Sequence, residues 1–158
     1  MPLRPVNIAD RSPGRLWLSS MPGRFEPWAD FLAESRLAKI GLVVCLTPRD
    51  EVATLSPAYW RAIGGGKLPF RWLHLPMQDF GLPSDPPAFR AGIEHAATRL
   101  LDGDAVMLHC AAGLGRTGTA AACLLKRLGL DTNEAMQRIR DAGSNPQTAL
   151  QSGLVDQF

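Results

Sequence analysis

The chain alternates short apolar runs with longer amphipathic or largely apolar segments. The short runs, bounded by turn residues, predict β-strands near 16–19, 42–46, 70–75 and 105–109. The longer segments predict helices near 27–38, 57–63, 86–101, 117–128, 132–142 and 148–157. Because strands alternate with helices, we expect an α/β fold with a central, mostly parallel sheet flanked by helices.

The most informative segment is the loop between the strand at 105–109 and the apolar, alanine-rich helix that follows. From 109 to 118 it is His-Cys-Ala-Ala-Gly-Leu-Gly-Arg-Thr-Gly. The unpaired N–H groups and positive dipole of a helix N-terminus favour an anion there. Gly113 and Gly115 let the backbone turn its N–H groups inward. The loop therefore predicts a phosphate-binding cradle made by Ala111, Ala112, Gly113, Leu114, Gly115 and Arg116.

Side chains of this loop have the chemistry to attack a phosphate ester. Arg116 can hold two phosphoryl oxygens with its fork. Cys110 lies where a helix N-terminus and a cation favour the nucleophilic thiolate. Thr117 can offer its hydroxyl to that sulfur, and we expect His109 to orient the loop through backbone hydrogen bonds. A lone cysteine in such a turn is more commonly a small buried hydrophobe. The two glycines and Arg116 favour catalysis, and the spacing matches neither a Walker nor a Rossmann loop.

These residues resemble the H-C-x5-R-[ST] signature of cysteine-dependent protein phosphatases. Within this protein tyrosine phosphatase superfamily the chain resembles the dual-specificity branch, and most closely the kinase-associated phosphatase group (cyclin-dependent kinase inhibitor type). Four further segments carry the resemblance: 16–25, 43–47, 75–83, and 147–151 with the ending 156–158. The resemblance implies the fold of that superfamily. It also implies hydrolysis of phosphotyrosine and/or phosphoserine/threonine esters through a phosphocysteine intermediate on Cys110.

The reaction also needs an acid that protonates the leaving oxygen and can then activate water. Asp79 is the best-placed residue, in a Pro- and Gly-rich loop after the predicted strand at 70–75. The resemblance puts the general acid at the same residue. Asp85 is the alternative, but it precedes two prolines and is better explained as the N-cap of the helix at 86–101.

Three more residues enter through the resemblance. Cys45 stands where this branch carries a second cysteine, so a reversible disulfide with Cys110 would protect the thiolate from irreversible oxidation. A buried strand cysteine explains Cys45 equally well. Gln147 and Gln151 belong to a Gln-Thr-x-x-Gln segment that we expect near the active loop, in contact with substrate or water. A glutamine on a terminal helix is nevertheless usually solvated.

Length and composition set the broad class. With 158 residues, 46% of them hydrophobic, the chain fits a single phosphatase domain spanning 1–158. A net charge of +2 without a basic run argues against a nucleic-acid partner, and no apolar run reaches membrane-spanning length.

The chain has no secretory signal pattern, and its three cysteines form no disulfide framework. We therefore expect a cytoplasmic protein, and a monomer. His74 and His95 lack metal-type partners, so we expect no metal and no other cofactor.

The loop also bears on the substrate. Related lipid phosphatases carry lysines here to hold inositol head groups, whereas the corresponding residues are Ala111 and Leu114. This favours a phosphorylated protein over a phosphoinositide. The connection 48–66 is too short for the recognition loop of tyrosine-specific enzymes, which favours dual specificity. The alternatives are a phosphoinositide or other small-molecule phosphatase, a non-catalytic phospho-binding module, and another thiolate enzyme such as an arsenate reductase or sulfurtransferase.

Overall fold

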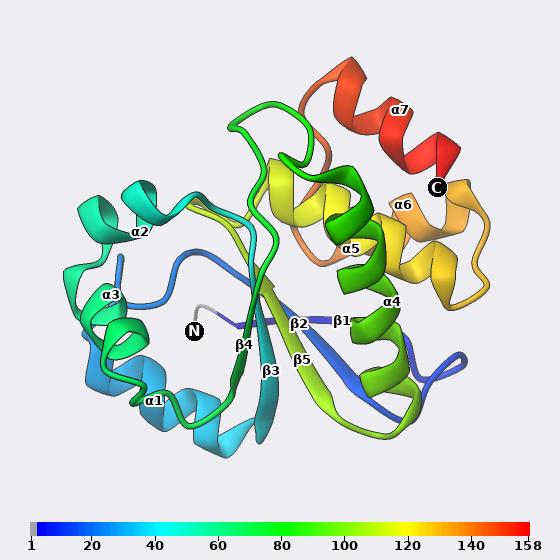
Figure 1. The fold of residues 1–158 in the computed structure, drawn as a ribbon. Helices are drawn as coiled ribbons and strands as arrows, with labels where there is room; N and C mark the ends of the chain where they lie inside the picture. The colour runs from blue at the N-terminus through cyan, green and yellow to red at the C-terminus, as the bar shows by residue number, and fades with distance from the viewer. Residues whose placement is uncertain (1–2) are drawn as a thin grey trace.

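The computed structural model describes residues 3–158, which form one five-stranded β-sheet with helices packed on both faces (Figure 1). Its strands are β1 (Arg4–Val6), β2 (Arg15–Ser19), β3 (Ile40–Cys45), β4 (Arg71–His74) and β5 (Ala105–His109). Its helices are α1 (Trp28–Leu37), α2 (Arg49–Leu55), α3 (Pro57–Gly64), α4 (Pro86–Leu101), α5 (Gly115–Arg127), α6 (Thr132–Asp141) and α7 (Ala149–Gln157). The predicted α/β class, with a mostly parallel sheet between helices, is confirmed.

The sheet has the strand order β1-β2-β5-β3-β4, and only the edge pair β1–β2 is antiparallel. Every residue of the central strand β5 is buried, which explains why its sequence is apolar on both faces. Its last residue, His109, is in register with Ser19 of β2 and Cys45 of β3. The loop after β5 therefore starts at the carboxyl edge of the parallel strands, where such sheets bind ligands.

Two helical layers cover the two faces of the sheet (Figure 1): α1, α2 and α3 on one face and α4 to α7 on the other. Successive strand residues serve opposite layers, as the period of two requires. Val43 and Met107 pack with Phe31 of α1, whereas Val44 and Leu108 join the core formed with α4 and α5. No helix within residues 3–158 has the length and apolar character needed to cross a membrane.

The structure adds two elements that the apolar pattern does not predict. β1 has three residues and contains Pro5, which an edge strand tolerates because the missing N–H faces away from the sheet. α2 has seven residues and a mainly polar sequence, so it leaves no apolar stripe. α5 begins at Gly115, two residues before the predicted start at 117. The prediction is late because glycine has a low helix propensity, so Gly115 gives no helical signal.

Candidate active site

The sulfur of Cys110 lies between β5 and α5 and accepts two hydrogen bonds. The N–H of Gly113 donates to it at 3.2 Å, and the hydroxyl of Thr117 donates to it at 3.0 Å. Cys110 is buried, and the helix that follows begins at Gly115. Two donors and the positive end of a helix dipole therefore act on one sulfur, an arrangement that stabilises a thiolate.

The loop can take this shape because Gly113 has no side chain. Its φ is +76°, a left-handed conformation that favours glycine. A Cβ at this position would also lie 2.6 Å from the carbonyl oxygen of Ser19 on the neighbouring strand. Any other residue at 113 would therefore push the loop away from β2.

Neighbouring segments hold the carbonyl groups of the loop from outside. The carbonyl of Ala111 accepts from the N–H of Met21 at 3.2 Å and from Arg24 at 3.0 Å. The carbonyl of Leu114 accepts from the N–H of Gly118 at 2.8 Å and of Asn145 at 3.3 Å. Because a trans peptide points its C=O and N–H in opposite directions, carbonyls held outside leave N–H groups directed toward the centre of the loop. The loop thus has the form of the predicted anion cradle.

Arg116 is held by a carboxylate that the sequence argument missed. Its side chain is 3% exposed, and its two terminal nitrogens donate to the two carboxylate oxygens of Glu51 at 3.1 and 2.8 Å. One of them also donates to the carbonyl of Met77 at 3.3 Å. Burial by itself lowers the pKa of Arg116. The hydrogen bonds with Glu51 and the charges of Cys110, Glu51 and Asp79 outweigh burial, so the pKa is raised overall.

Asp79 reaches the same arginine from the segment between β4 and α4. Its carboxylate oxygen lies 3.6 Å from a terminal nitrogen of Arg116, and its side chain is 61% exposed. A tight turn directs it, with Phe80 at φ +58° and the N–H of Gly81 donating to Gln78 at 2.9 Å. The structure therefore brings Asp79 and the Cys110 loop together.

Asp85 has a different position and a different partner. Its carboxylate accepts the N–H of Ala88 at 3.1 Å, which makes it the N-cap of α4. This is the role that the sequence favours for Asp85.

The Gln-Thr-x-x-Gln segment packs against the Asp79 turn. Thr148 donates to the carbonyl of Phe80 at 3.1 Å, and the side chain of Gln151 donates to the carbonyl of Gly81 at 3.2 Å. Gln151 is fully buried, so it supports the turn and is not solvated. Gln147 is exposed. It lies beside the loop, since a Cβ on Gly115 would be 2.5 Å from its amide oxygen.

His109 faces the layer of α3 and joins a chain of hydrogen bonds. Its Nδ1 lies 3.1 Å from the carbonyl of Cys110, its Nε2 lies 2.8 Å from the hydroxyl of Tyr59, and Trp72 donates to that hydroxyl at 2.7 Å. A neutral ring with its proton on Nδ1 satisfies every partner. Complete burial lowers the pKa of His109 to about 4, which keeps the ring neutral.

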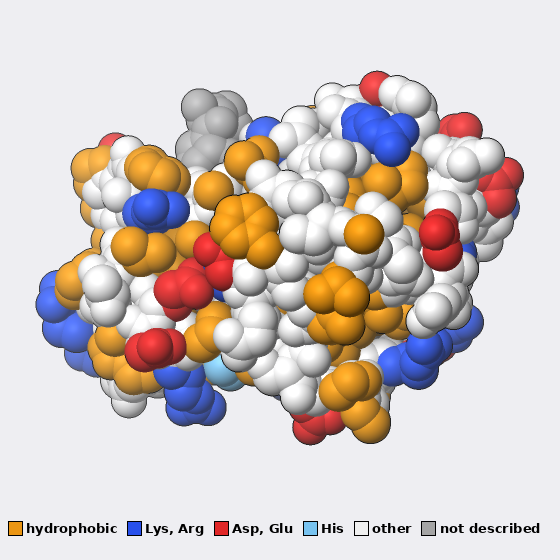
Figure 2. Space-filling view, turned by 90° about the horizontal axis from the view of Figure 1, so that it is seen from above, with side chains coloured by type: hydrophobic (Ala, Val, Ile, Leu, Met, Phe, Trp, Pro, Cys, Tyr) orange, Lys and Arg blue, Asp and Glu red, His pale blue; other side chains and the backbone are white. Residues whose placement is uncertain are grey.

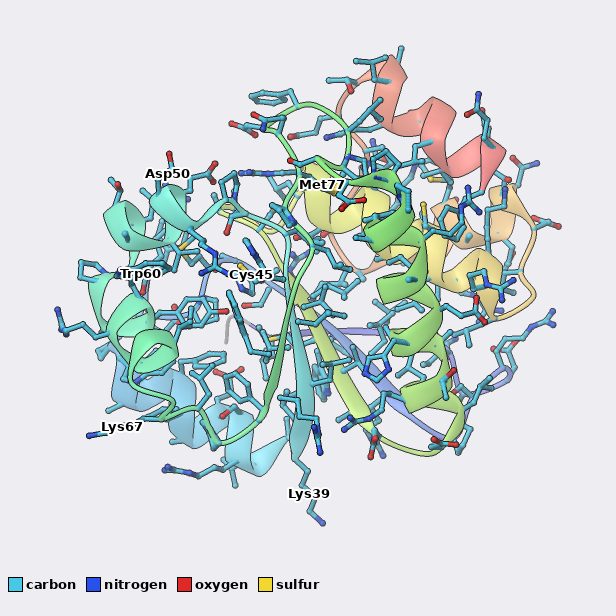
Figure 3. All side chains as sticks on the ribbon, viewed as in Figure 1. Lys39, Cys45, Asp50, Trp60, Lys67 and Met77 are labelled. Carbon is cyan, nitrogen blue, oxygen red and sulfur yellow. The ribbon has the colours of Figure 1, made fainter. Side chains whose placement is uncertain are left out.

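Cys45 and Cys110 are both free thiols whose side chains serve opposite faces of the sheet. Cys45 packs with Val52 and Tyr59, while Cys110 belongs to the core on the α5 side. Figure 3 shows Cys45 on the side of the sheet that faces α2 and α3. Burial raises the pKa of Cys45, which counteracts its reactivity. A disulfide with Cys110 would need the two Cα atoms within about 7 Å and Cβ atoms that face each other.

The fold and this loop define a cysteine-dependent phosphatase. The chain belongs to the PTP-SAK family, the Swiss Army Knife protein DSP-PTPase phosphatase domain, whose model matches residues 12–152. A comparison with curated proteins finds no match.

Three solved structures illustrate the similarity. A kinase associated phosphatase (KAP) with its catalytic-site cysteine replaced by serine has a TM-score of 0.84 and 22% identity, covering 99% of this chain and 92% of that one. Tk-PTP in its active form has a TM-score of 0.70 and 26% identity, covering 95% and 97%. PTPMT1 in complex with PI(5)P has a TM-score of 0.69 and 20% identity, covering 90% and 88%. The predicted resemblance to dual-specificity phosphatases, including the kinase-associated type, is confirmed.

Proposed function

We propose that the protein hydrolyses phosphate monoesters through a phosphocysteine intermediate on Cys110. The observation that carries this proposal is the sulfur of Cys110, which accepts hydrogen bonds from Gly113 and Thr117 at the N-terminus of α5. The thiolate attacks phosphorus, and the bond from phosphorus to the ester oxygen breaks. The carboxylic acid of Asp79 gives its proton to that leaving oxygen.

The second half of the reaction uses the same groups in reverse. Asp79, now a carboxylate, takes a proton from water as the water oxygen attacks the phosphocysteine. The phosphorus–sulfur bond breaks, which returns the thiolate and releases inorganic phosphate. Thr117 stabilises the sulfur as leaving group through its 3.0 Å hydrogen bond. We assign Gln147, which is exposed beside Gly115, to contact with this water.

Arg116 retains one free edge for the phosphoryl group. Of its five N–H groups, two donate to Glu51 and one to Met77. The remaining two, on Nε and on one terminal nitrogen, form the fork that binds two phosphoryl oxygens. Asp79 lies 3.6 Å from that terminal nitrogen, so the acid and the phosphate clamp share one side of the guanidinium.

A phosphorylated protein is the substrate class that the surroundings of the loop favour. The cradle contributes the uncharged side chains of Ala111 and Leu114. Large apolar side chains are exposed on the loop and on the segments next to it: Phe25, Phe80, Leu82, Leu114 and Leu150. The face seen in Figure 2 accordingly carries hydrophobic patches with acidic groups between them. Such a rim suits one phosphate on an apolar peptide better than a head group with several phosphates.

A phosphoinositide is the second candidate substrate, because the similar structure of PTPMT1 holds PI(5)P. The test compares release of inorganic phosphate from phosphotyrosine and phosphothreonine peptides with release from vesicles that contain a phosphoinositide. Wild type is assayed beside Cys110→Ser, which should be inactive on every substrate. Activity that survives in Cys110→Ser would contradict the mechanism, and a preference for the vesicles would replace the protein substrate by a lipid.

A further inference from the structure

Arg4 reaches the cradle from the edge strand β1. One terminal nitrogen of its guanidinium donates to the carbonyl of Gly113. The other donates to the carbonyl of Ala142 at 2.6 Å and to the hydroxyl of Ser144 at 3.0 Å. Ser144 in turn donates to the same carbonyl of Gly113 at 2.6 Å. One carbonyl of the loop therefore accepts two hydrogen bonds, one of them from a cation.

The peptide that carries this carbonyl also carries the N–H of Leu114. Because the peptide is trans, a carbonyl fixed toward Arg4 directs the N–H of Leu114 to the opposite side, into the cradle. Within residues 3–158 the N–H of Leu114 has no hydrogen-bond acceptor, so it is available to an oxyanion. Hydrogen bonds to the carbonyl also polarise the amide and make its N–H a stronger donor.

The positive charge of Arg4 near Cys110 also favours binding of an anion in the cradle. Burial lowers the pKa of Arg4, and the charge of Cys110 raises it. A guanidinium nevertheless remains protonated in proteins, so Arg4 is a fixed cation near the sulfur. Arg116 is the second cation, Glu51 and Asp79 are the carboxylates that face it, and His109 is neutral. Within the described part of the chain, residues 3–158, the hydrogen-bond partners of Arg4 include no carboxylate, unlike those of Arg116.

We propose that Arg4 is a positioning residue of the phosphate-binding loop, which fixes and polarises the Gly113–Leu114 peptide so that the N–H of Leu114 binds a phosphoryl oxygen. This inference rests on the proposed function, because it assigns a further residue to the same site. It acts through the peptide, and Arg4 does not touch the substrate.

Calorimetric titration with tungstate, a tetrahedral oxyanion like phosphate, tests the proposal without any turnover. The variants are Arg4→Met, Arg4→Lys and Ser144→Ala, with Arg15→Met as the matched control on the exposed part of neighbouring β2. The dissociation constant should rise about tenfold in Arg4→Met and by a smaller factor in Ser144→Ala. Arg4→Lys should recover part of the loss, and Arg15→Met should match wild type.

The outcomes separate the positioning role from a structural one. A purely structural residue would lower the unfolding temperature and the fraction of folded protein, but the folded fraction would bind tungstate as wild type does. Wild-type affinity in folded Arg4→Met would therefore overturn the proposal. If Arg4→Met does not fold, Arg4→Lys decides, because it keeps the positive charge but replaces the two-nitrogen fork by one ammonium group, and wild-type affinity in folded Arg4→Lys would overturn the proposal. Failure of wild type to release phosphate from any monoester would instead contradict the proposed function.

Discussion

Glu51 binds both terminal nitrogens of Arg116, at 3.1 and 2.8 Å, and leaves the Nε edge of the guanidinium without a hydrogen-bond partner among residues 3–158. The pair joins the first turn of α2 to the first turn of α5, two helices on opposite faces of the sheet (Figure 1). Arg116 is buried and Glu51 is partly exposed. Arginine is charged with or without a partner, so the main effect of this bidentate pair is to fix the orientation of the guanidinium.

Replacing Glu51 by Gln should therefore impair binding of the phosphoryl group. One carboxylate oxygen becomes an amide that faces the guanidinium with its own N–H groups, so the fork loses its fixed direction. We expect kcat/KM for para-nitrophenyl phosphate to fall by roughly one to two orders of magnitude. Asp50→Asn, an exposed neighbour on the same helix, is the control and should keep wild-type kinetics. Wild-type kinetics in both Glu51→Gln and Asp50→Asn would show that Arg116 binds the phosphoryl group without help from Glu51.

Asp79→Ala should remove the general acid while leaving the cradle intact. We expect kcat to fall by about two to four orders of magnitude, since proton transfer in the transition state is lost. The loss should be larger with phenyl phosphate than with para-nitrophenyl phosphate, because nitrophenolate leaves without protonation. Asp85→Ala tests the alternative acid: it should lose about 1 kcal/mol of stability as an N-cap and keep its activity. The reverse pattern would assign the acid to Asp85.

Stability should depend on pH through His109. Its pKa is about 4 in the folded protein and near 6.5 when exposed, so the unfolded state binds more protons between these values. The neutral ring therefore contributes fully above pH 6.5, and about 3 kcal/mol is lost as pH falls from 6.5 to 4. Urea unfolding at several pH values measures this slope. His109→Gln should flatten it, whereas exposed His95→Gln should not. An unchanged slope in His109→Gln would assign the pH dependence elsewhere.

The disulfide between Cys45 and Cys110 stays a prediction, and the structure sharpens its test. The two side chains belong to core clusters on opposite faces of the sheet. If it forms, wild type inactivated by mild peroxide should regain activity with dithiothreitol, while Cys45→Ser should pass to irreversibly oxidised Cys110. Peptide mass spectrometry identifies the products. Oxidised Cys110 beside a free Cys45 in wild type would refute the disulfide.

The parts of the site that lie close together in sequence could be predicted from it. Cys110, Arg116 and Thr117 share one strand–loop–helix segment, so their spacing predicts that they meet at one anion site. The parallel sheet could be predicted for a similar reason, because apolar runs buried on both faces differ from amphipathic helices in length and composition.

Residues that reach the loop from elsewhere in the chain leave no such pattern. Glu51 lies on a short polar helix and Arg4 on a three-residue strand, and only the packed structure shows what they contact. The one signal for Glu51 is its position soon after the carboxyl end of β3, beside the strand that precedes the loop. A buried arginine needs a counter-charge, and that edge of the sheet is where it could be sought. Gln151 shows the opposite error, because tertiary packing buries a glutamine that its helix would leave solvated.

The hydrogen bonds of Arg4 connect the beginning of the chain to residues near its end, with the cysteine loop between them. A ribosome makes β1 before the loop, and Ser144 only after α5 and α6. During synthesis the cysteine therefore emerges before the groups that hold Gly113 are all present. Contacts of such large sequence separation slow folding, because the entropy of closing the chain between them must be overcome first. The Gly113 carbonyl can therefore be held by both of its donors only after α5 and α6 have been made and Ser144 has docked against the loop.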